Sequence, residues 1–407
     1  MEIRAGKLRE TLELLEPVVP KKSALLPVLV NVLLKDGQAM ATDLEATVTV
    51  ELPEAVETFL VPHRNVLELL YRIPANQAVT MEANESKLVL SWAGGQATYD
   101  SGNPDDYPLL PKMESAGEGT LDGDILVLGL LSVVGYCVKD AARPILTGVA
   151  MEFGDRMAVA AADGFRLAIR DLPLGFPQPA GVPQVVVIPG RAVRLLGRLW
   201  KKAPGTAQVD LVTDLAHLAV AKRPLEMAVN AAYLQARFGR VTMLTQLIQG
   251  TFPNYRQLVP EKFAFRVRVM ARDLEQGCRA IQQVAKDGSG IVRLVWSNST
   301  LSLSARADEV GEIKLSIPVQ TDGGEGKTAL KINYLLAYLR GKEGLVEMRV
   351  NTPASPVVFH HSNSPLVVVM PMFVQWDGPP APSQREPEPQ AQEEAEVPNE
   401  GAEPEGE

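Results

Sequence analysis

Few side chains in this sequence stand at spacings that support catalysis or metal binding. The two cysteines, Cys137 and Cys278, are far apart, and each falls on an apolar helix face, as buried small residues do. The four histidines are scattered apart from His360-His361, and neighbouring residues of a strand point to opposite faces. A zinc site needs clustered cysteines and histidines at set spacings. The sequence therefore predicts no metal site and no cofactor.

Motifs for phosphate binding and for nucleophilic catalysis are also missing. The chain has no Gly-x-x-x-x-Gly-Lys-Ser/Thr loop, no Gly-x-Gly-x-x-Gly opening a helix after a strand, and no Gly-x-Ser-x-Gly elbow. Asp43 and Asp163 recur at equivalent places, but each follows a strand and precedes a turn, where aspartate caps backbone N–H groups. A serine or cysteine nucleophile has no obvious base. We expect a protein without enzymatic activity; an enzyme whose site spans domain junctions is the alternative.

The strongest functional signal is positive charge on one predicted helix. Arg191, Arg194, Arg198 and Lys201 recur at i, i+3, i+7 and i+10, with Lys202 beside them. Corresponding helices elsewhere carry Arg64 and Arg72, and Lys331, Arg340 and Lys342. One such stripe is usually a solvated surface, but its recurrence favours a polyanionic partner. Without interleaved aromatic residues or a recognition helix, the pattern indicates phosphate contact that is blind to base sequence.

These segments belong to a block that occurs three times. Pro27–Leu29 returns as Pro144–Leu146, and Ala41–Asp43 returns as Ala161–Asp163. A period of about 120 residues is too long for a solenoid unit and is the size of an independent domain. The chain is therefore expected to contain three related domains.

Each copy is expected to begin with an amphipathic helix, from near Gly6 to Pro17, from near Asp124 to about Lys139, and from an N-cap at Asp273 to Gly288. Strands are predicted at Leu29–Leu34, Gln38–Asp43 and Thr47–Glu51, and at Gly148–Phe153, Met157–Ala162 and Arg166–Asp171. The last strands are predicted at Pro356–His360 and Leu366–Val374, and the extra stretch Leu225–Phe238 is predicted as a short helix or long loop. The second helices bury Val66, Leu69, Leu70 and Ile73; Val193, Leu196 and Trp200; and Ile332, Leu335, Leu336 and Leu339.

The order of elements in each copy is roughly βαβββαβββ. Short joins imply mainly antiparallel sheets with helices on one face, so the fold class is α+β, with two helices per domain. We expect domains at 1–120, 121–252 and 253–376. The remainder, 377–407, holds ten acidic residues, one basic residue and seven prolines, and is expected to be a disordered acidic tail. No signal peptide or long apolar run opens the chain, which indicates a cytoplasmic location.

Several stretches carry a family resemblance. Ala162-Asp163-Gly164-Phe165-Arg166-Leu167-Ala168, preceded by Arg143–Gly148, is similar to a Thr-Asp-Gly-His-Arg-Leu-Ala block. Phe252-Pro253-Asn254-Tyr255 is similar to a Phe-Pro-Asp-Tyr linker, and Val368-Val369-Met370-Pro371-Met372 to a Val-Val-Met-Pro-Met end. Thr42–Glu45 adds a weaker match. Through these motifs, residues 1 to about 375 resemble the β subunit of bacterial DNA polymerase III, the sliding clamp.

The resemblance implies three tandem DNA-clamp domains that form half of a ring. Two chains, head to tail, would enclose duplex DNA, with helices lining the hole. It also implies an apolar cleft between copies two and three that takes a Gln-Leu-x-Leu-Phe-like peptide from the polymerase III catalytic subunit, the clamp loader and repair or translesion polymerases. The deeper pocket is expected from Leu146, Ala162, Gly164, Phe165, Arg166, Leu167, Pro253, Leu258, Val368 and Met370, and the shallower end from Tyr334, Ala354, Pro371 and Met372.

Two further sets of residues are expected from the resemblance together with charge and apolar placement. DNA contacts are expected from Lys22, Arg64, Arg72, Arg143, Arg191, Arg194, Arg198 and Lys201. The homodimer interface is expected to place Tyr107, Leu109 and Leu110 against Ile281, Val284 and Ala285.

The chain departs from the family pattern inside the expected cleft. Phe165 replaces a frequent histidine, Ala162 replaces a threonine, and Phe373 stands where a basic residue is usual. These changes make the cleft more apolar. They motivate an alternative function, a specialised clamp paralogue of the inhibitor-resistant or mobile-element kind with altered partner choice.

Overall fold

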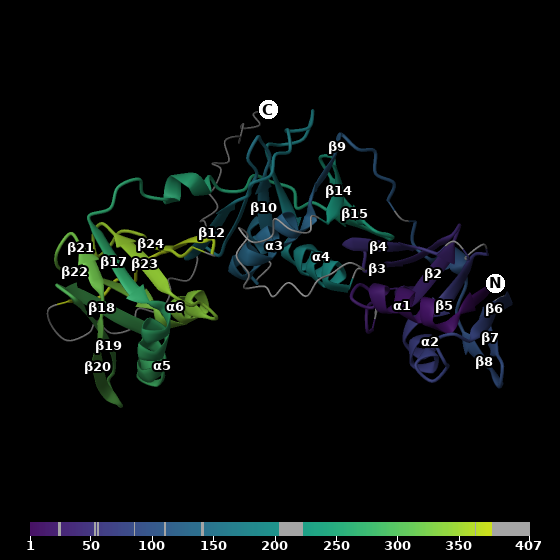
Figure 1. Cartoon of the computed structure of the whole chain (residues 1–407), viewed down its shortest axis with the longest axis horizontal. Helices are drawn as coiled ribbons and strands as arrows, with labels where there is room; N and C mark the ends of the chain where they lie inside the picture. The colour runs from purple at the N-terminus through teal and green to yellow at the C-terminus, as the bar shows by residue number, and fades with distance from the viewer. Residues whose placement is uncertain are drawn as a thin grey trace, which may run out of the picture.

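The computed structural model describes residues 1–22, 26–52, 54, 57–84, 86–109, 111–139, 142–202, 223–362 and 364–376. These residues form three lobes that follow one another along an arc, with the first repeat at one end and the third at the other (Figure 1). The predicted acidic tail, 377–407, lies outside the described residues. Within those ranges, no helix is long and apolar enough to cross a membrane.

Each lobe repeats one order of elements: a strand, a helix, four strands, a second helix and three strands. The first lobe contains β1 (Glu2–Arg4), α1 (Ala5–Leu15), β2 (Asn31–Lys35), β3 (Gln38–Thr42), β4 (Ala46–Glu51), β5 (Phe59–Pro62), α2 (His63–Leu70), β6 (Ala78–Asn84), β7 (Lys87–Trp92) and β8 (Gly95–Asp100). The second contains β9 (Gly117–Asp122), α3 (Gly123–Val133), β10 (Gly148–Glu152), β11 (Ala158–Ala162), β12 (Arg166–Asp171), β13 (Val185–Pro189), α4 (Gly190–Lys202), β14 (Pro224–Val229), β15 (Tyr233–Phe238) and β16 (Val241–Gln246).

The third lobe follows the same order with one extra short strand, β21. It contains β17 (Phe265–Met270), α5 (Ala271–Asp287), β18 (Ile291–Ser297), β19 (Thr300–Ala307), β20 (Gly311–Pro318), β21 (Gln320–Asp322), β22 (Gly326–Lys331), α6 (Ile332–Leu339), β23 (Leu345–Val350), β24 (Val357–His360) and β25 (Leu366–Val369). The α+β class, two helices per repeat and antiparallel pairing are confirmed. The three domain limits stay predictions.

The order has one more strand before each second helix than the sequence pattern predicted. β5, β13 and β22 lead into α2, α4 and α6 with no residue between strand and helix. A turn residue is what marks a strand end in a sequence. Two of these joins carry a proline, Pro62 of β5 and Pro189 of β13, which is equally typical of a helix start, and the third has no turn residue. The sequence pattern therefore did not separate the short apolar strands from the helices that follow them.

Other elements differ from the prediction for local reasons. α5 begins at Ala271 with Met270 as its N-cap, so Asp273 lies in the first turn instead of capping the helix. α3 ends at Val133, where the 3-10 turn Val134–Tyr136 begins, earlier than the predicted Lys139. Leu225–Phe238 forms β14 and β15, and the alternating burial of β14 is the two-residue period of a strand.

Two sheets continue through the junctions between lobes. β4 of the first lobe pairs antiparallel with β16 of the second, and β12 of the second pairs with β25 of the third. The resulting sheets have eight and nine strands, and a four-stranded sheet lies in each end lobe. In these end sheets, β8 and β20 are the last strands in the order. The two outer ends of the arc therefore each present a strand edge.

The helices pack on their sheets through the predicted apolar faces. Val66 and Leu70 of α2, and Val193, Leu196 and Trp200 of α4, are buried in one large apolar core. α4 turns toward the concave side of the arc, as do α1 and α2 of the first lobe and α6 of the third (Figure 1). The repeat thus places a helical surface along the inside of the arc.

A buried histidine makes the first lobe sensitive to pH. His63 Nε2 lies 2.9 Å from the carbonyl oxygen of Leu12 and so joins α2 to α1. Burial lowers the pKa of His63 below its ordinary 6.5. Because the folded state disfavours the protonated form of His63, neutral His63 contributes fully to stability above pH 6.5. This contribution is lost as the pH falls through the lowered pKa.

We therefore expect the melting temperature of the wild-type protein to fall more between about pH 7.5 and about pH 5.5 than that of His63→Gln. Glutamine keeps a donor for the Leu12 carbonyl but does not titrate. Thermal denaturation followed by circular dichroism at both pH values measures the difference. An equal fall in melting temperature in the two proteins would show that His63 does not set the pH response.

Candidate functional site

The predicted cleft residues gather where the second and third lobes meet. In the β12–β25 pair, Leu167 stands opposite Val368. The buried side chains of Leu146, Leu167 and Val368 belong to one apolar cluster, to which Phe252 of the linker contributes and against which Ala162 packs. Residues from three distant parts of the sequence are thus brought together at this junction.

The turn between β11 and β12 holds Phe165 at the surface. Asp163 Oδ1 accepts hydrogen bonds from the backbone N–H groups of Phe165 at 3.0 Å and Arg166 at 2.8 Å. Gly164, between Asp163 and Phe165, has φ +88°, a backbone conformation that residues with a side chain rarely adopt. Asp43 accepts bonds of the same kind in the turn between β3 and β4. The structural role predicted for the two aspartates is confirmed.

Aromatic rings surround the guanidinium of Arg166. Its central carbon lies 5.0 Å from the ring centroid of Tyr136 and 4.5 Å from that of Tyr334, and Arg166 pairs with Asp163 at 2.8 Å. The Phe165 ring stacks on Tyr334 with centroids 6.3 Å apart, yet Phe165 is 46% exposed. Cation–π and stacking contacts therefore tie the second lobe to α6 while an aromatic ring stays accessible.

The chain after β25 runs beside β22, the last strand of the third lobe's own sheet. The Met370 N–H donates to the Phe165 carbonyl and the Met372 N–H donates to the Ala329 carbonyl, each at 2.8 Å. Met370 is partly exposed, and Phe373 is 90% exposed. A large apolar ring left in water is a common feature of surfaces that bind partners. Met370, Phe165 and Phe373 thus leave apolar surface around this segment.

The remaining predicted cleft residues lie around this region. Pro253 is exposed, Leu258 is half exposed in the 3-10 turn Tyr255–Leu258, Pro371 and Met372 are half buried, and Ala354 is exposed in the turn between β23 and β24. Three further residues of this region, Tyr136, Phe252 and Lys331, were not predicted as part of the cleft. The Lys331 Nζ lies 5.8 Å from the Phe165 ring centroid. Phe252 stood inside a quoted motif, whereas Tyr136 was hidden in the overlong helix prediction.

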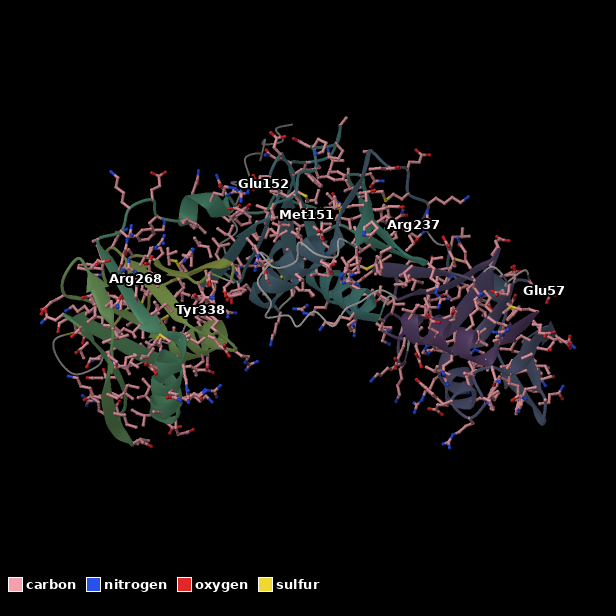
Figure 2. The ribbon with its side chains drawn as sticks, viewed as in Figure 1. Glu57, Met151, Glu152, Arg237, Arg268 and Tyr338 are labelled. Carbon is pink, nitrogen blue, oxygen red and sulfur yellow. The ribbon has the colours of Figure 1, made fainter. Side chains whose placement is uncertain are left out.

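The linker between the second and third lobes is fixed to the second. The Tyr255 hydroxyl donates to Glu152 Oε2, and the Arg256 guanidinium donates to the same oxygen at 2.9 and 3.1 Å. Glu152 ends β10 and lies on the side of the second lobe that the linker crosses (Figure 2). Tyr255 belongs to the apolar cluster of the junction and Val259 packs against it, so these contacts fix the linker to that cluster.

The predicted basic stripe lies on the surface of α4. Arg191, Arg194, Arg198 and Lys201 are exposed, while the opposite face of the helix is buried. Arg64 on α2 is 86% exposed and pairs with Glu68 at 3.1 Å. Lys22, Arg72 and Arg143 are exposed as well.

Several of these cations have partners that the sequence did not indicate. Arg191 pairs with Asp43 of the first lobe at 2.8 Å. Arg194 donates to the Val134 carbonyl, and Arg198 donates to a carbonyl of the first lobe. The stripe is therefore partly engaged inside the chain, and substituting Arg191 would disturb a lobe junction as well as the surface charge.

The predicted dimer residues require a correction. Ile281, Val284 and Ala285 are buried in the core of their own lobe, and Tyr107 is buried against Leu29, Leu33 and Leu60 of the first lobe. Leu109 is 99% exposed, and Leu110 lies outside the described residues. The apolar periodicity of α5 correctly predicted a buried helix face. That face packs against the sheet of its own lobe, so these three residues offer no surface to another chain.

Two cysteines are the candidate nucleophiles among the described residues. Cys137 and Cys278 are buried, and burial raises the pKa of their thiols to about 11 and about 12. Among the described residues, no group of three or more histidine, cysteine, aspartate or glutamate side chains could hold a metal ion. The junction cleft and the basic helical face are the candidate functional sites.

Comparison with known proteins agrees with this geometry. The crystal structure of the DNA polymerase III subunit beta from Pseudomonas aeruginosa superposes with a TM-score of 0.79 at 22% identity, covering 91% of this chain and 99% of that one. That of Thermotoga maritima gives 0.77 at 20% identity, covering 92% and 99%. The beta sliding clamp of Synechococcus elongatus is 26% identical over 368 residues, 87% of this chain and 93% of that protein.

The fold is that of the DNA clamps. Models of the central and C-terminal domains of the DNA polymerase III beta subunit match residues 133–254 and 256–373, more than half of the chain. The chain belongs to the DNA polymerase III beta subunit family.

Proposed function

We propose that this protein is a sliding clamp, a processivity factor without enzymatic activity that encircles duplex DNA as a homodimer and tethers the replicative polymerase. The observation that carries the proposal is the three-lobed arc with a basic helix on its concave side (Figure 1). Enclosure holds DNA without strong contacts, so weak, sequence-blind phosphate contacts suffice and permit sliding.

The decisive experiment compares topologies of DNA. After loading by its clamp loader, the protein is expected to remain on a nicked circular plasmid and to leave within minutes once the plasmid is cut. Gel filtration before and after cleavage measures the retained fraction. Equal retention on circular and linear DNA would contradict enclosure.

The proposed ring closure uses the strand pairing that is found at both lobe junctions. In each, the third strand after a lobe's first helix pairs with the last strand of the next lobe: β4 with β16, and β12 with β25. The equivalent strands left at the outer ends are β20 and β8. We propose that β20 of one chain pairs with β8 of the other, twice per ring. Partly exposed Ile313 and half-buried Ile317 of β20, and half-buried Tyr99 of β8, supply apolar contacts at these edges.

Contacts to DNA are proposed along α2 and α4. Arg64→Gln combined with Arg198→Gln removes one cation from each of two lobes. We expect weaker binding of a short duplex and a slope of log affinity against log salt that is less steep by up to about two, because each neutralised phosphate contributes about 0.9. Fluorescence anisotropy across a salt series measures this slope. An unchanged slope would place the DNA away from these helices.

The junction cleft is proposed to bind peptides of the polymerase III catalytic subunit, the clamp loader and repair or translesion polymerases. Its apolar cluster suits leucine and phenylalanine side chains, and the partly exposed Met370 adapts to several partners. The aromatic pair Phe165 and Tyr334 would contact the peptide where the two lobes meet.

The specialised paralogue remains the second candidate, because Phe165 and Phe373 add apolar surface where the family pattern has polar residues. A narrowed set of partners would follow from that change. Complementation of a clamp-deficient strain separates the two functions: growth supports the replicative clamp, and failure with normal loading on DNA supports the paralogue.

A further inference from the structure

The first anchor between α4 and the first lobe is Arg191. Its guanidinium lies 2.8 Å from Asp43 Oδ2 and 3.4 Å from Glu45 Oε2. The Asp43 side chain is only 9% exposed, whereas that of Glu45 is 60% exposed. Solvent and salt screen an exposed pair far more than a buried one. Asp43 therefore fixes Arg191, and Glu45 is an exchangeable second acceptor.

The second anchor is at the far end of α4, where it meets the C-terminal end of α1. Lys202 Nζ donates to the Glu13 carbonyl at 2.8 Å and lies 3.4 Å from Glu16 Oε2, whose side chain is also 60% exposed. Arg198 donates to the Pro17 carbonyl at 3.4 Å. A helix C-terminus carries partial negative charge and unpaired carbonyls, so it attracts cations.

The cations that make these contacts share one edge of α4. Arg191, Arg198 and Lys202 follow one another at i, i+7 and i+11, which places them on one side of the helix. Between Arg191 and Arg198, a cavity of about 10 Å³ opens against Asp43 and Glu45 on a partly apolar floor that includes Pro17 and Leu195, so charged groups and apolar side chains line the seam together. The carboxylates and carbonyls of the first lobe thus pair with an edge of α4 that can bind anions.

We propose that Glu45 and Glu16 take the place of phosphate groups in the free protein, where they pair with Arg191 and Lys202. Duplex phosphates displace these two carboxylates when DNA lies along the concave face. This inference rests on the proposed clamp function and adds a conformational consequence. Asp43 and the α1 carbonyls keep the lobes joined, while loss of the two exposed pairs loosens the seam between lobes one and two.

Neutralising the two carboxylates tests the exchange. In Glu16→Gln with Glu45→Gln, phosphates no longer compete with internal anions. We expect duplex affinity to rise severalfold at an unchanged salt slope, because the same phosphates are paired in both proteins and only the cost of displacing the two carboxylates is removed. Fluorescence anisotropy with a short duplex across a salt series measures both quantities.

The matched control is Glu10→Gln with Glu51→Gln. Glu10 pairs with Arg240 at 2.8 Å and Glu51 pairs with Arg237 at 3.0 Å, so both also bridge lobes one and two, but through the β15–β16 hairpin instead of α4. The control removes the same charge from the same lobe. We expect its duplex affinity to match that of the wild type. Equal changes in the two double variants would reduce the effect to net charge and overturn the exchange.

Lobe separation gives a readout that does not depend on DNA affinity. Because both native cysteines are buried, spin labels at Asn84→Cys and Gln184→Cys would report the distance between lobes one and two. We expect the distance distribution to broaden in the Glu16/Glu45 variant without DNA, and in the wild type only when DNA is added. If the distance distributions of wild type and variant are identical without DNA, the two exposed ion pairs do not hold the seam and the inference is wrong. If the wild-type protein is not retained on circular DNA, the proposed clamp function is wrong instead.

Discussion

Ile313→Lys is expected to convert the proposed dimer into single chains of 44.1 kDa. Ile313 is a partly exposed residue of β20, the edge strand assigned to ring closure. A charge placed on an edge strand blocks pairing with another sheet. A loss of about 2 kcal/mol at each interface doubles in a ring with two interfaces, so the dimer dissociation constant should rise about 1,000-fold. Sedimentation velocity at micromolar concentration measures the change.

The matched control is Val295→Lys. Val295 is exposed to a similar degree and belongs to the same sheet, but it lies on β18, an inner strand. It should leave the dimer intact. If Ile313→Lys remains dimeric, or if both variants dissociate alike, the ring does not close through the β20 edge.

Tyr334→Ala is expected to weaken binding of a Gln-Leu-x-Leu-Phe-like peptide about 30-fold, or about 2 kcal/mol, because buried aromatic contacts dominate such interfaces. Tyr334 holds both Phe165 and Arg166 from across the lobe junction. Its removal therefore takes a contact away from two other side chains of the cleft at once. Isothermal titration calorimetry measures the affinity.

Asn333→Ala provides the comparison, because Asn333 is an exposed neighbour on α6. It should bind the peptide as the wild type does, and both variants should still form dimers. Unchanged affinity in Tyr334→Ala would place the peptide site elsewhere.

Periodicity in the sequence located the six helices but not how they begin. Leu8, Leu12 and Leu15 of α1 repeat at helical spacing and are fully buried, as predicted. Asp273 looked like an N-cap, yet β17 runs directly into α5 and Met270 takes that position. Local propensity marks an aspartate as a good cap, but the strand that precedes the helix decides where the helix starts.

The cleft was predicted through motifs, because spacing alone does not reveal it. Leu167 and Val368 are 201 positions apart and meet only because β12 pairs with β25. The same limit explains the two largest surprises. Arg191 finds its partner Asp43 in another repeat, and Ile281 buries its apolar side chain in its own lobe. A sequence shows that a side chain is charged or apolar, but tertiary pairing determines its partner.

The eight- and nine-stranded sheets that cross the lobe junctions give every lobe two pairing edges. Both junctions join the same two strand positions, so one edge of a lobe pairs with the lobe before it and the other with the lobe after it. Pairing covers edges that would otherwise be open to aggregation. A lobe expressed alone would expose both edges at once and is expected to polymerise head to tail.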